Sequence, residues 1–277
     1  MSNHDSSTGS PLGKTVAYET RYNPALLYPI PRAEKRVELG ITGDLPFVGV
    51  DIWNAYELSW LNPRGKPMVA LGELIVPADS PNIIESKSLK LYLNTYNQTG
   101  FGGIDEVQAR IAADLSKAAG AAVEVHLTPV DQAKRGIGVP AGICIDSLDI
   151  AIDTYQPAPH LLKVLPGSNA SDEILYSHLL KSNCLVTGQP DWGMLAVRYS
   201  GPSVDRESLL RYVVSFREHN EFHEQCVERI FTDILRRCGP ERLAVWARYT
   251  RRGGLDINPV RATDKEWADA NVPEARQ

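Results

Sequence analysis

Residues 88–96 read SLKLYLNTY, and residues 208–216 read SLLRYVVSF. A shift of the chain by 120 residues superimposes these two stretches without a gap and also aligns residues 123–125 with residues 243–245. The aligned pairs are Ser88 with Ser208, Leu89 with Leu209, Tyr92 with Tyr212, Tyr96 with Phe216, Val107 with Val227, and Leu115 with Leu235. Because the correspondence continues through two predicted helices and the next strand, it predicts a duplicated module.

The hydrophobic periodicity predicts the same order of elements in both copies. In the first copy we expect strands at 51–61 and 67–76, helices from Lys87 and Asp105, and strands near Val123 and Ile143. In the second copy we expect strands at 179–183 and 194–199, two helices, and a return pair of strands that begins with 243–249. The last helix is predicted to start near Asn220, a good N-cap, and to stop at Gly239-Pro240. Each module is therefore β-β-α-α-β-β, and the fold class is α+β.

A stretch rich in Pro, Gly, Ser and Asn divides the two copies. It predicts a linker at 156–172, an N-terminal module at 1–155 and a C-terminal module at 173–277. We expect the residues after Pro259 to form a loosely held tail.

The composition is that of a globular protein, with 277 residues of which 43% are hydrophobic and 23% charged. The net charge of −5 disfavours direct binding of nucleic acid. The segment Met1–Lys14 is polar, without the apolar core of a signal peptide, and no run is long enough to span a membrane. We therefore expect a cytoplasmic protein. Its four cysteines include no C-x-x-C pair, which disfavours a disulfide framework or a structural zinc site.

Residues suited to chemistry are concentrated in the second copy. Cys184 aligns with Arg64, and the pair His223-Glu224 aligns with residues 103–104, Gly-Ile. Cys184 follows a predicted strand, and Asp191, beyond a Gly-Gln-Pro turn, can fold back toward it. A thiol attacks as its thiolate and needs a separate acid to protonate the developing anion. A buried spare cysteine beside a turn-forming aspartate remains the alternative, and His223 alone is typical of a helix boundary.

The first copy carries a different set. Residues 85–87, Glu-Ser-Lys, align with residues 205–207, Asp-Arg-Glu. Both copies have an acid at the first position, but only the first copy has Ser-Lys after it. The turn at 250–254, Thr-Arg-Arg-Gly-Gly, suits a phosphate group, although a plain basic turn fits it equally well. The glycines at 100–103 and 136–138 are poor matches to a dinucleotide fingerprint, so a nicotinamide cofactor would bind without a Rossmann fold.

Taken together, these motifs resemble the NADPH-dependent 7-cyano-7-deazaguanine reductase family in its long, two-module form. The resemblance covers nearly the whole chain, from Val48 to Pro259. The motifs that carry it are Glu85 to Tyr92, Cys184 to Gly193, Ser215-Phe216-Arg217, Asn220 to Cys226, and Arg251 to Leu255.

The resemblance implies a tandem tunnelling fold (T-fold), with antiparallel sheets and helices on one face, and a homodimer. It implies that Cys184 adds to the substrate nitrile as a covalent thioimide and that Asp191 donates a proton, in tRNA queuosine biosynthesis. It assigns the deazaguanine to Ile84, Glu85, Ser86, His223 and Glu224. It assigns NADPH to Ser86, Lys87, Arg252 and Gly253, with no metal ion required.

Two rival interpretations remain. A zinc-dependent GTP or pterin hydrolase of the same fold would use Cys184 and His223 as ligands with a further Cys or His, but no such residue is in the turn after Cys184. A non-catalytic purine-binding module would show scattered losses of site residues, whereas each type of site residue is present in one copy.

Overall fold

A computed structural model describes residues 18–167, 171–267 and 271–277. The segment Met1–Lys14 and part of the predicted linker lie outside these residues. The chain divides into two compact units. Unit 1 comprises 1–36, 51–134 and 251–256, and unit 2 comprises 37–50, 135–250 and 257–277.

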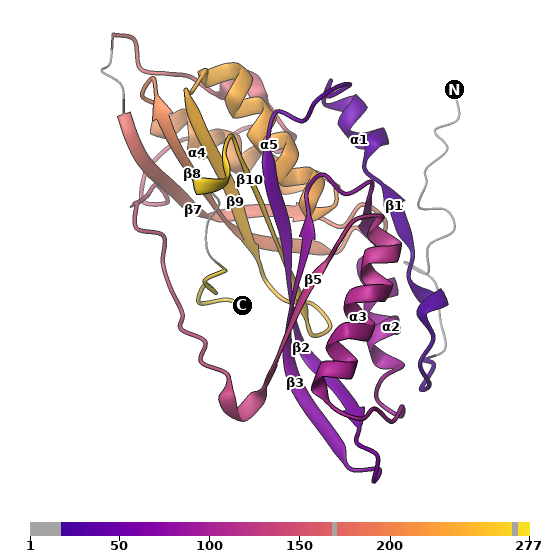
Figure 1. Ribbon diagram of the computed structural model, residues 1–277. Helices are drawn as coiled ribbons and strands as arrows, with labels where there is room; N and C mark the ends of the chain where they lie inside the picture. The colour runs from indigo at the N-terminus through magenta and orange to yellow at the C-terminus, as the bar shows by residue number, and fades with distance from the viewer. Residues whose placement is uncertain (1–17, 168–170, 268–270) are drawn as a thin grey trace. The chain divides into compact units, whose positions relative to one another are not determined.

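Unit 1 contains a sheet with the strand order β5-β3-β2 and two helices (Figure 1). Its elements include β1 (Pro29–Pro31), β3 (Pro67–Pro77), β4 (Asn82–Ile84), α2 (Ser86–Asn94), α3 (Ile104–Ala119) and β5 (Glu124–Pro129), with most of β2 (Val48–Leu61). Its 3-10 helices are η2 (Pro24–Leu26) and η3 (Val130–Gln132). Helix α3 buries one residue on each turn, at Val107, Ile111, Leu115 and Ala119. That spacing forms the apolar stripe by which an amphipathic helix packs against a sheet.

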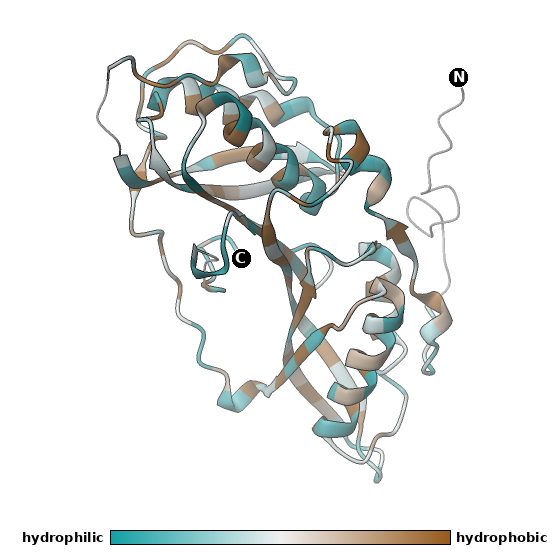
Figure 2. Ribbon diagram, turned by 45° about the horizontal axis from the view of Figure 1, so that its top comes forward, coloured by the Kyte–Doolittle hydropathy of each residue, from teal (hydrophilic) through white to brown (hydrophobic). Residues whose placement is uncertain are grey.

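Unit 2 contains strands in the order β10-β9-β8-β7-β6. Its elements are β6 (Ile143–Cys144), β7 (Ser171–Asn183), β8 (Pro190–Gly201), α4 (Arg206–Ser215), α5 (His223–Cys238) and β9 (Arg242–Tyr249), with most of β10 (Leu255–Ala262). Its 3-10 helices are η4 (Pro159–Leu161), η5 (Phe216–Glu218) and η6 (Lys265–Trp267). Helix α1 (Ala33–Glu38) belongs to both units, because unit 1 ends at residue 36 and unit 2 begins at residue 37. Figure 2 shows hydrophobic and hydrophilic segments alternating along the helices of both units, as expected for helices that cover a sheet with one face.

The predicted order of long strands and helices is confirmed, and the fold is α+β. The sheet is mixed, however, not purely antiparallel. Ile143 and Cys144 pair in parallel with Leu175 and Tyr176 of β7, so the strand expected near Ile143 lies in unit 2 and does not close the first module. A two-residue strand contains too little periodicity to reveal its partner in the sequence.

The C-terminal residues are more ordered than the sequence suggested. Strand β10 continues past Pro259 to Ala262 and is buried along its length. Trp267 packs between the guanidinium groups of Arg198 and Arg242, each 4.3 Å from a ring centroid. Gln277 donates hydrogen bonds to the Tyr249 carbonyl oxygen and to Asn258. The expectation of a loosely held tail is therefore wrong for the described residues.

The two units repeat one local construction. In unit 1, Ser88 Oγ donates to the Glu85 carbonyl oxygen at 2.7 Å and accepts from the Tyr28 N–H. In unit 2, Ser208 Oγ donates to the Asp205 carbonyl oxygen at 2.7 Å and accepts from the Lys163 N–H.

The ends of the two helices match as well. The N–H groups of Asn23 and Ala158 donate to the hydroxyls of Thr95 and Ser215, respectively. In both units a segment that carries a Pro-containing 3-10 helix therefore binds hydroxyl groups at both ends of the first long helix. These equivalent contacts support the duplication.

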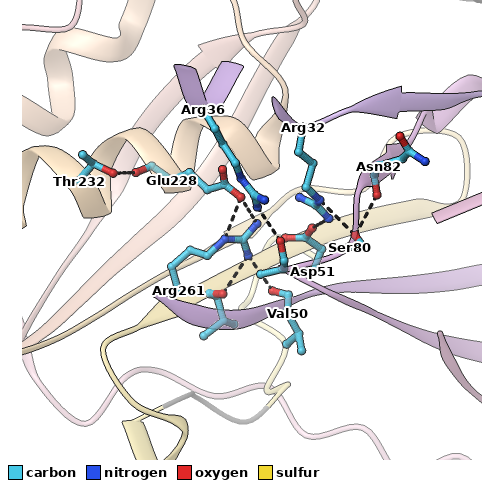
Figure 3. Close-up of polar contacts among 11 residues, drawn as sticks. Arg32, Arg36, Val50, Asp51, Ser80, Asn82, Glu228, Thr232 and Arg261 are labelled. Atoms are coloured by element: carbon cyan, nitrogen blue, oxygen red, sulfur yellow. Dashed lines mark hydrogen bonds and ion pairs between the residues drawn. The ribbon is translucent and has the colours of Figure 1, made fainter. Parts of the chain in front are cut away.

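Each unit also has a buried ion pair (Figure 3). In unit 1, Arg32 contacts Asp51 at 2.6 Å and donates to Ser80 Oγ. In unit 2, Arg261 on β10 contacts Glu228 on α5 at 2.9 Å, which ties the helix to the sheet. All four charged side chains are at most 3% exposed, so each charge depends on its partner.

Candidate active site

Cys184 lies at the closed end of the β7–β8 hairpin. The strands end and begin at Asn183 and Pro190, which are register partners. The Cys184 N–H donates to the Gln189 carbonyl oxygen at 2.8 Å, and the Gly188 N–H donates back to the Cys184 carbonyl oxygen at 3.0 Å. Gly188 has a φ of +66°, which a residue with a side chain rarely adopts. The turn therefore holds the cysteine in a fixed position between two strands.

Asp191 shares a sheet face with Cys184. Asp191 is the register partner of Ser182, so the two side chains point to the same face. Cys184 lies two residues after Ser182 and continues that face. Asp191 is 3% exposed and Cys184 is 6% exposed. A thiol and a carboxyl group are thus placed together and are mostly shielded from water.

His223 joins these groups from the first turn of α5. Its Nε2 lies 3.5 Å from Asp191 Oδ1. The Tyr249 ring packs against the imidazole edge to face, with centroids 4.1 Å apart and an interplanar angle of 89°. Gly193 makes room for this ring, because a Cβ there would lie 3.1 Å from Tyr249 Cδ1. The histidine is therefore oriented by an aromatic ring on one side and faces a carboxylate on another.

Tyr249 is a site residue that sequence reasoning missed. Burial and the nearby Cys226 raise the pKa of its hydroxyl well above the usual value, so the hydroxyl stays protonated. The one sequence feature that points to Tyr249 is Gly193, because a glycine in a strand leaves room for a large side chain on the neighbouring strand. That neighbour cannot be identified without the β8–β9 register.

Backbone pairing brings the start of α5 to the end of β7. The Asn183 N–H donates to the His219 carbonyl oxygen, and the Glu221 N–H donates to the Asn183 carbonyl oxygen. Asn220 accepts a hydrogen bond from the Asn183 side chain and does not cap the helix. The helix begins at His223, after Phe222, whose side chain makes no capping bond. The prediction of an Asn220 N-cap is therefore wrong, whereas Gly239 ends the helix as predicted, in the left-handed conformation.

A buried acid beside this segment was also missed. Glu221 is 3% exposed and accepts two hydrogen bonds from Arg229, at 2.7 and 3.0 Å, with His219 Nε2 3.0 Å away. Burial acts to raise the pKa of Glu221, but the hydrogen bonds from His219 and Arg229 outweigh it and hold the pKa below its usual value. Glu221 therefore stays ionised and fixes the segment before α5. Glu224, in the first turn of α5, is likewise only 3% exposed.

In unit 1, Glu85 caps helix α2. Its two carboxylate oxygens accept the backbone N–H groups of Lys87 and Ser88 at 2.7 and 2.8 Å. Ile84, the last residue of β4, is buried, and Ser86 begins the helix. The sequence-predicted residues 84–87 are thus a strand-to-helix junction in which a carboxylate is held rigidly by its own helix.

Arg252 and Gly253 form a tight turn in the same unit. The Arg252 N–H donates to the Leu255 carbonyl oxygen at 2.9 Å, and Gly253 and Gly254 have φ values of +57° and +73°. A Cβ at Gly253 would lie 3.2 Å from Lys90 Cδ on α2. A pocket of about 190 Å³ opens here. Its lining includes Lys90, Asn94, Asn97, Gly253 and Gly254.

Part of this lining suits a nucleotide cofactor. The lysine supplies positive charge for a phosphate, the two asparagines supply amide groups, and the glycines leave the backbone accessible to a ligand. Glu57 also lines the pocket, and its carboxylate suits a hydroxyl or amide donor and not a phosphate. In unit 2 the structure therefore places His223 against Asp191, with Cys184 next along the sheet face that carries Asp191. It places residues 84–87 and the turn at 252–253 in unit 1.

The chain matches known proteins along almost its whole length. A family model described as "Nitrile reductase, 7-cyano-7-deazaguanine-reductase N-term" matches residues 18–127, and one described as "QueF-like protein" matches residues 190–268. Relatives named NADPH-dependent 7-cyano-7-deazaguanine reductase occur in Azoarcus sp. strain BH72, Dechloromonas aromatica and Ralstonia nicotianae. The first is 64% identical over 97% of this chain and 95% of its own length. The second is 62% identical, with 99% and 97% covered, and the third is 58% identical, with 97% and 98% covered. This chain therefore belongs to the family of NADPH-dependent 7-cyano-7-deazaguanine reductases.

Proposed function

We propose that this protein uses NADPH to reduce the nitrile of 7-cyano-7-deazaguanine to an aminomethyl group, and that Cys184 forms a covalent thioimide with the substrate. The observation that carries the mechanism is the placement of Cys184 and Asp191 on one shielded sheet face, with His223 3.5 Å from the carboxylate. Family membership supplies the substrate class and the cofactor.

The first step is addition of the thiol to the nitrile. The sulfur forms a bond to the nitrile carbon, one carbon–nitrogen π bond breaks, and its electron pair becomes a new N–H bond. Asp191 takes the proton of Cys184 as the attacking thiolate forms and passes it to the nitrile nitrogen, so no proton is gained or lost overall. His223, beside Asp191, is placed to hold the carboxyl group in position. Capture converts an inert triple bond into a C=N acceptor at a fixed position.

Reduction then completes the reaction. Two molecules of NADPH, bound one after the other, would each supply one hydride to take the captured carbon to the aminomethyl level, while two protons from water complete the product amine and the Cys184 thiol. The carbon–sulfur bond breaks between the two reductions, and its electron pair returns to Cys184 as thiolate. The enzyme is thereby regenerated, and the mostly buried position of the cysteine limits competing hydrolysis of the thioimide.

Recognition of the substrate is assigned to Ile84, Glu85, Ser86, His223 and Glu224. A guanine-like edge presents N–H donors, which a carboxylate accepts in pairs. Glu85 already accepts two backbone N–H groups, and its Oε1 also accepts the Ser86 hydroxyl at 3.5 Å, which leaves the second lone pair of Oε2 for a ligand. The helix therefore fixes the acceptor in place and leaves it capable of binding a ligand.

The cofactor is assigned to Ser86, Lys87, Arg252 and Gly253. The pocket beside Gly253 supports this assignment, because Lys90 adds a cation to the same region. These residues would hold the phosphates by charge and hydrogen bonds without a Rossmann fold.

The architecture and the cellular setting complete the proposal. The repeated contacts at Ser88 and Ser208 support two T-fold modules, and they assign residues 158–163, within the linker predicted at 156–172, to the second module. A homodimer follows from the family resemblance, and a net charge of −5 disfavours direct contact with nucleic acid. The need for NADPH and a reduced thiol suits the cytoplasm. Among the described residues, no helix is both long and apolar enough to cross a bilayer.

The test is to mix the protein with 7-cyano-7-deazaguanine in the absence of NADPH and to measure the intact mass. We expect one adduct of the full substrate mass, because the addition releases nothing, and no adduct in Cys184→Ala. Cys226→Ala is the matched control, since Cys226 is fully buried on α5 and should affect stability but not capture. An adduct that persists in Cys184→Ala and disappears in Cys226→Ala would refute the assignment.

A metal requirement would favour the zinc-hydrolase interpretation. We expect full nitrile reduction after exhaustive dialysis against a chelator. Loss of turnover that returns only with Zn²⁺, in protein that stays folded and still forms no adduct at Cys184, would contradict the thiol mechanism.

A further inference from the structure

A second group of chemically capable side chains lies away from Cys184, between β6 and β7. The parallel register pairs Cys144 with Tyr176. Asp146 lies two residues after Cys144, in the turn that follows β6, and His178 lies two residues after Tyr176 on β7. The pairing of the two segments thus brings a thiol, a carboxylate and an imidazole to one place. One ligand atom from each of Cys144, Asp146 and His178 lies within 4.8 Å of the others.

Neighbouring groups already orient two of these side chains. Asp146 accepts hydrogen bonds from Ser177 Oγ at 2.5 Å and from the His178 N–H at 2.9 Å, one on each oxygen. The His178 ring packs edge to face against Tyr176, with centroids 5.6 Å apart.

The imidazole of His178 also has a carboxylate partner. His178 Nδ1 lies 3.6 Å from Glu274 Oε2, whose side chain is 4% exposed and receives a hydrogen bond from Arg276. A metal-bound histidine ordinarily has such a carboxylate beside its ring, which fixes the ring and increases its basicity. With Nε2 as the atom that binds the metal ion, Glu274 would be such an outer partner for Nδ1.

We propose that Cys144, Asp146 and His178 bind one divalent transition-metal ion, with Zn²⁺ preferred over Mg²⁺ or Ca²⁺. A set with sulfur, nitrogen and one oxygen suits Zn²⁺ or Co²⁺, whereas Mg²⁺ and Ca²⁺ require oxygen ligands. All three side chains are half-buried, which leaves room for a water molecule as fourth ligand.

The ion would act as a clip for β6. This strand has only two residues, and no helix or strand is assigned at 133–142, just before it. Two of the ligands, Cys144 and Asp146, come from β6 and the turn after it, and His178 comes from β7. A metal bridge would therefore fasten the segment to β7 without any part in the chemistry at Cys184.

The test uses untagged, metal-free protein titrated with Co²⁺. We expect one equivalent to bind, with the visible bands of tetrahedral cobalt and a thiolate-to-cobalt charge-transfer band, and Zn²⁺ should displace it. Cys144→Ser should remove the charge-transfer band, and His178→Ala should weaken binding by more than about 100-fold. Glu274→Gln should weaken it by about 10- to 100-fold.

Two controls separate this site from other thiols. Cys238→Ser changes a buried cysteine outside the cluster, and Cys184→Ala removes the catalytic thiol, so both should leave cobalt binding unchanged. Adduct formation at Cys184 in the Cys144→Ser and His178→Ala variants verifies that they are folded. Absence of stoichiometric binding overturns the proposal. Cobalt binding that survives in both Cys144→Ser and His178→Ala, or that depends on Cys184, also overturns the proposal. In that case Asp146 has only the structural role given by its hydrogen bonds.

Discussion

Helix α2 in unit 1 and helix α4 in unit 2 begin in the same way but differ in the residues just after the cap. Glu85 caps α2 through two backbone N–H groups, and Asp205, 120 residues later, caps α4 through the N–H of Ser208 alone. The residues after the caps are Ser86-Lys87 in unit 1 and Arg206-Glu207 in unit 2. Both copies therefore have the carboxylate that caps the helix, and only the first copy has the Ser-Lys pair assigned to ligand binding.

Helices α3 and α5 show the opposite asymmetry. Helix α3 follows Gly102-Gly103, and Glu106 in its first turn accepts the Gly102 N–H at 2.6 Å. Helix α5 instead presents His223 and Glu224 in its first turn, next to the hairpin that carries Cys184. The order of helices and strands is common to both units, while the groups proposed to react belong to unit 2. Substitutions at matched positions of the two units test this division.

The largest effect is expected at Asp191, which aligns with a leucine in the first copy. Asp191→Asn keeps the size of the side chain and removes the proposed proton donor, so thioimide formation and NADPH oxidation should both slow by about 10²- to 10⁴-fold. Stopped-flow measurement of the adduct and steady-state NADPH oxidation provide the two rates. Asp205→Asn, an acid with a purely local role in the same unit, is the matched control and should change neither rate more than about twofold. Equal losses in both variants would show that the effect is structural.

Loss of a buried ion pair should lower the unfolding free energy by a similar amount in each unit. Glu228→Ala leaves the Arg261 guanidinium buried without its carboxylate and should cost about 3–5 kcal/mol of unfolding free energy. Asp51→Ala should do the same to Arg32 in unit 1. Denaturant unfolding measures both. In a double variant, Glu228→Leu with Arg261→Met, most of the loss should be recovered, and a double variant as unstable as the single one would contradict this explanation.

Alkaline pH should destabilise unit 2 through Cys226. Burial, together with the charge of Glu221, raises the pKa of this thiol to about 12. Since the folded pKa lies above the unfolded value of about 9, the contribution to stability is complete below pH 9 and declines as the pH rises toward 12. The slope should be at most about 1.4 kcal/mol per pH unit. Unfolding of wild type and Cys226→Val between pH 8 and pH 11 should show a shallower decline in the variant, and identical slopes would exclude this thiol as the cause.

The sequence predicted those parts of the fold that local patterns determine. The shift by 120 residues located α2 and α4, and Gly239 marked the end of α5 because only a glycine adopts the left-handed cap readily. Parallel pairing of Cys144 with Tyr176 was not predictable, since 32 residues separate them and β6 has no periodicity of its own.

The candidate site divides in the same way. Cys184 and Asp191 could be proposed because a six-residue turn separates them in the chain, and the resemblance supplied their roles. The contact between Tyr249 and His223 depends on the β8–β9 register and on the position of α5, which no local pattern specifies. Asn220 was misplaced for a related reason, because its side chain had a better partner in Asn183, which is distant in sequence.

The smallest effect, and the most direct comparison of the two copies, is expected at the helix caps. Glu85→Ala and Asp205→Ala each remove a side-chain acceptor at a helix N-terminus, so each should lower the unfolding free energy by about 0.5–2 kcal/mol. Glu85→Ala should in addition weaken binding of 7-cyano-7-deazaguanine by more than about tenfold, because the same carboxylate is assigned to the substrate, whereas Asp205→Ala should bind with wild-type affinity. Calorimetric titration in the Cys184→Ala background separates binding from capture, and thermal unfolding reports the cap. Equal stability losses with unequal affinities would show that one structural role was duplicated and one ligand role was not. Wild-type affinity in Glu85→Ala would leave Glu85 with the same purely structural function as Asp205.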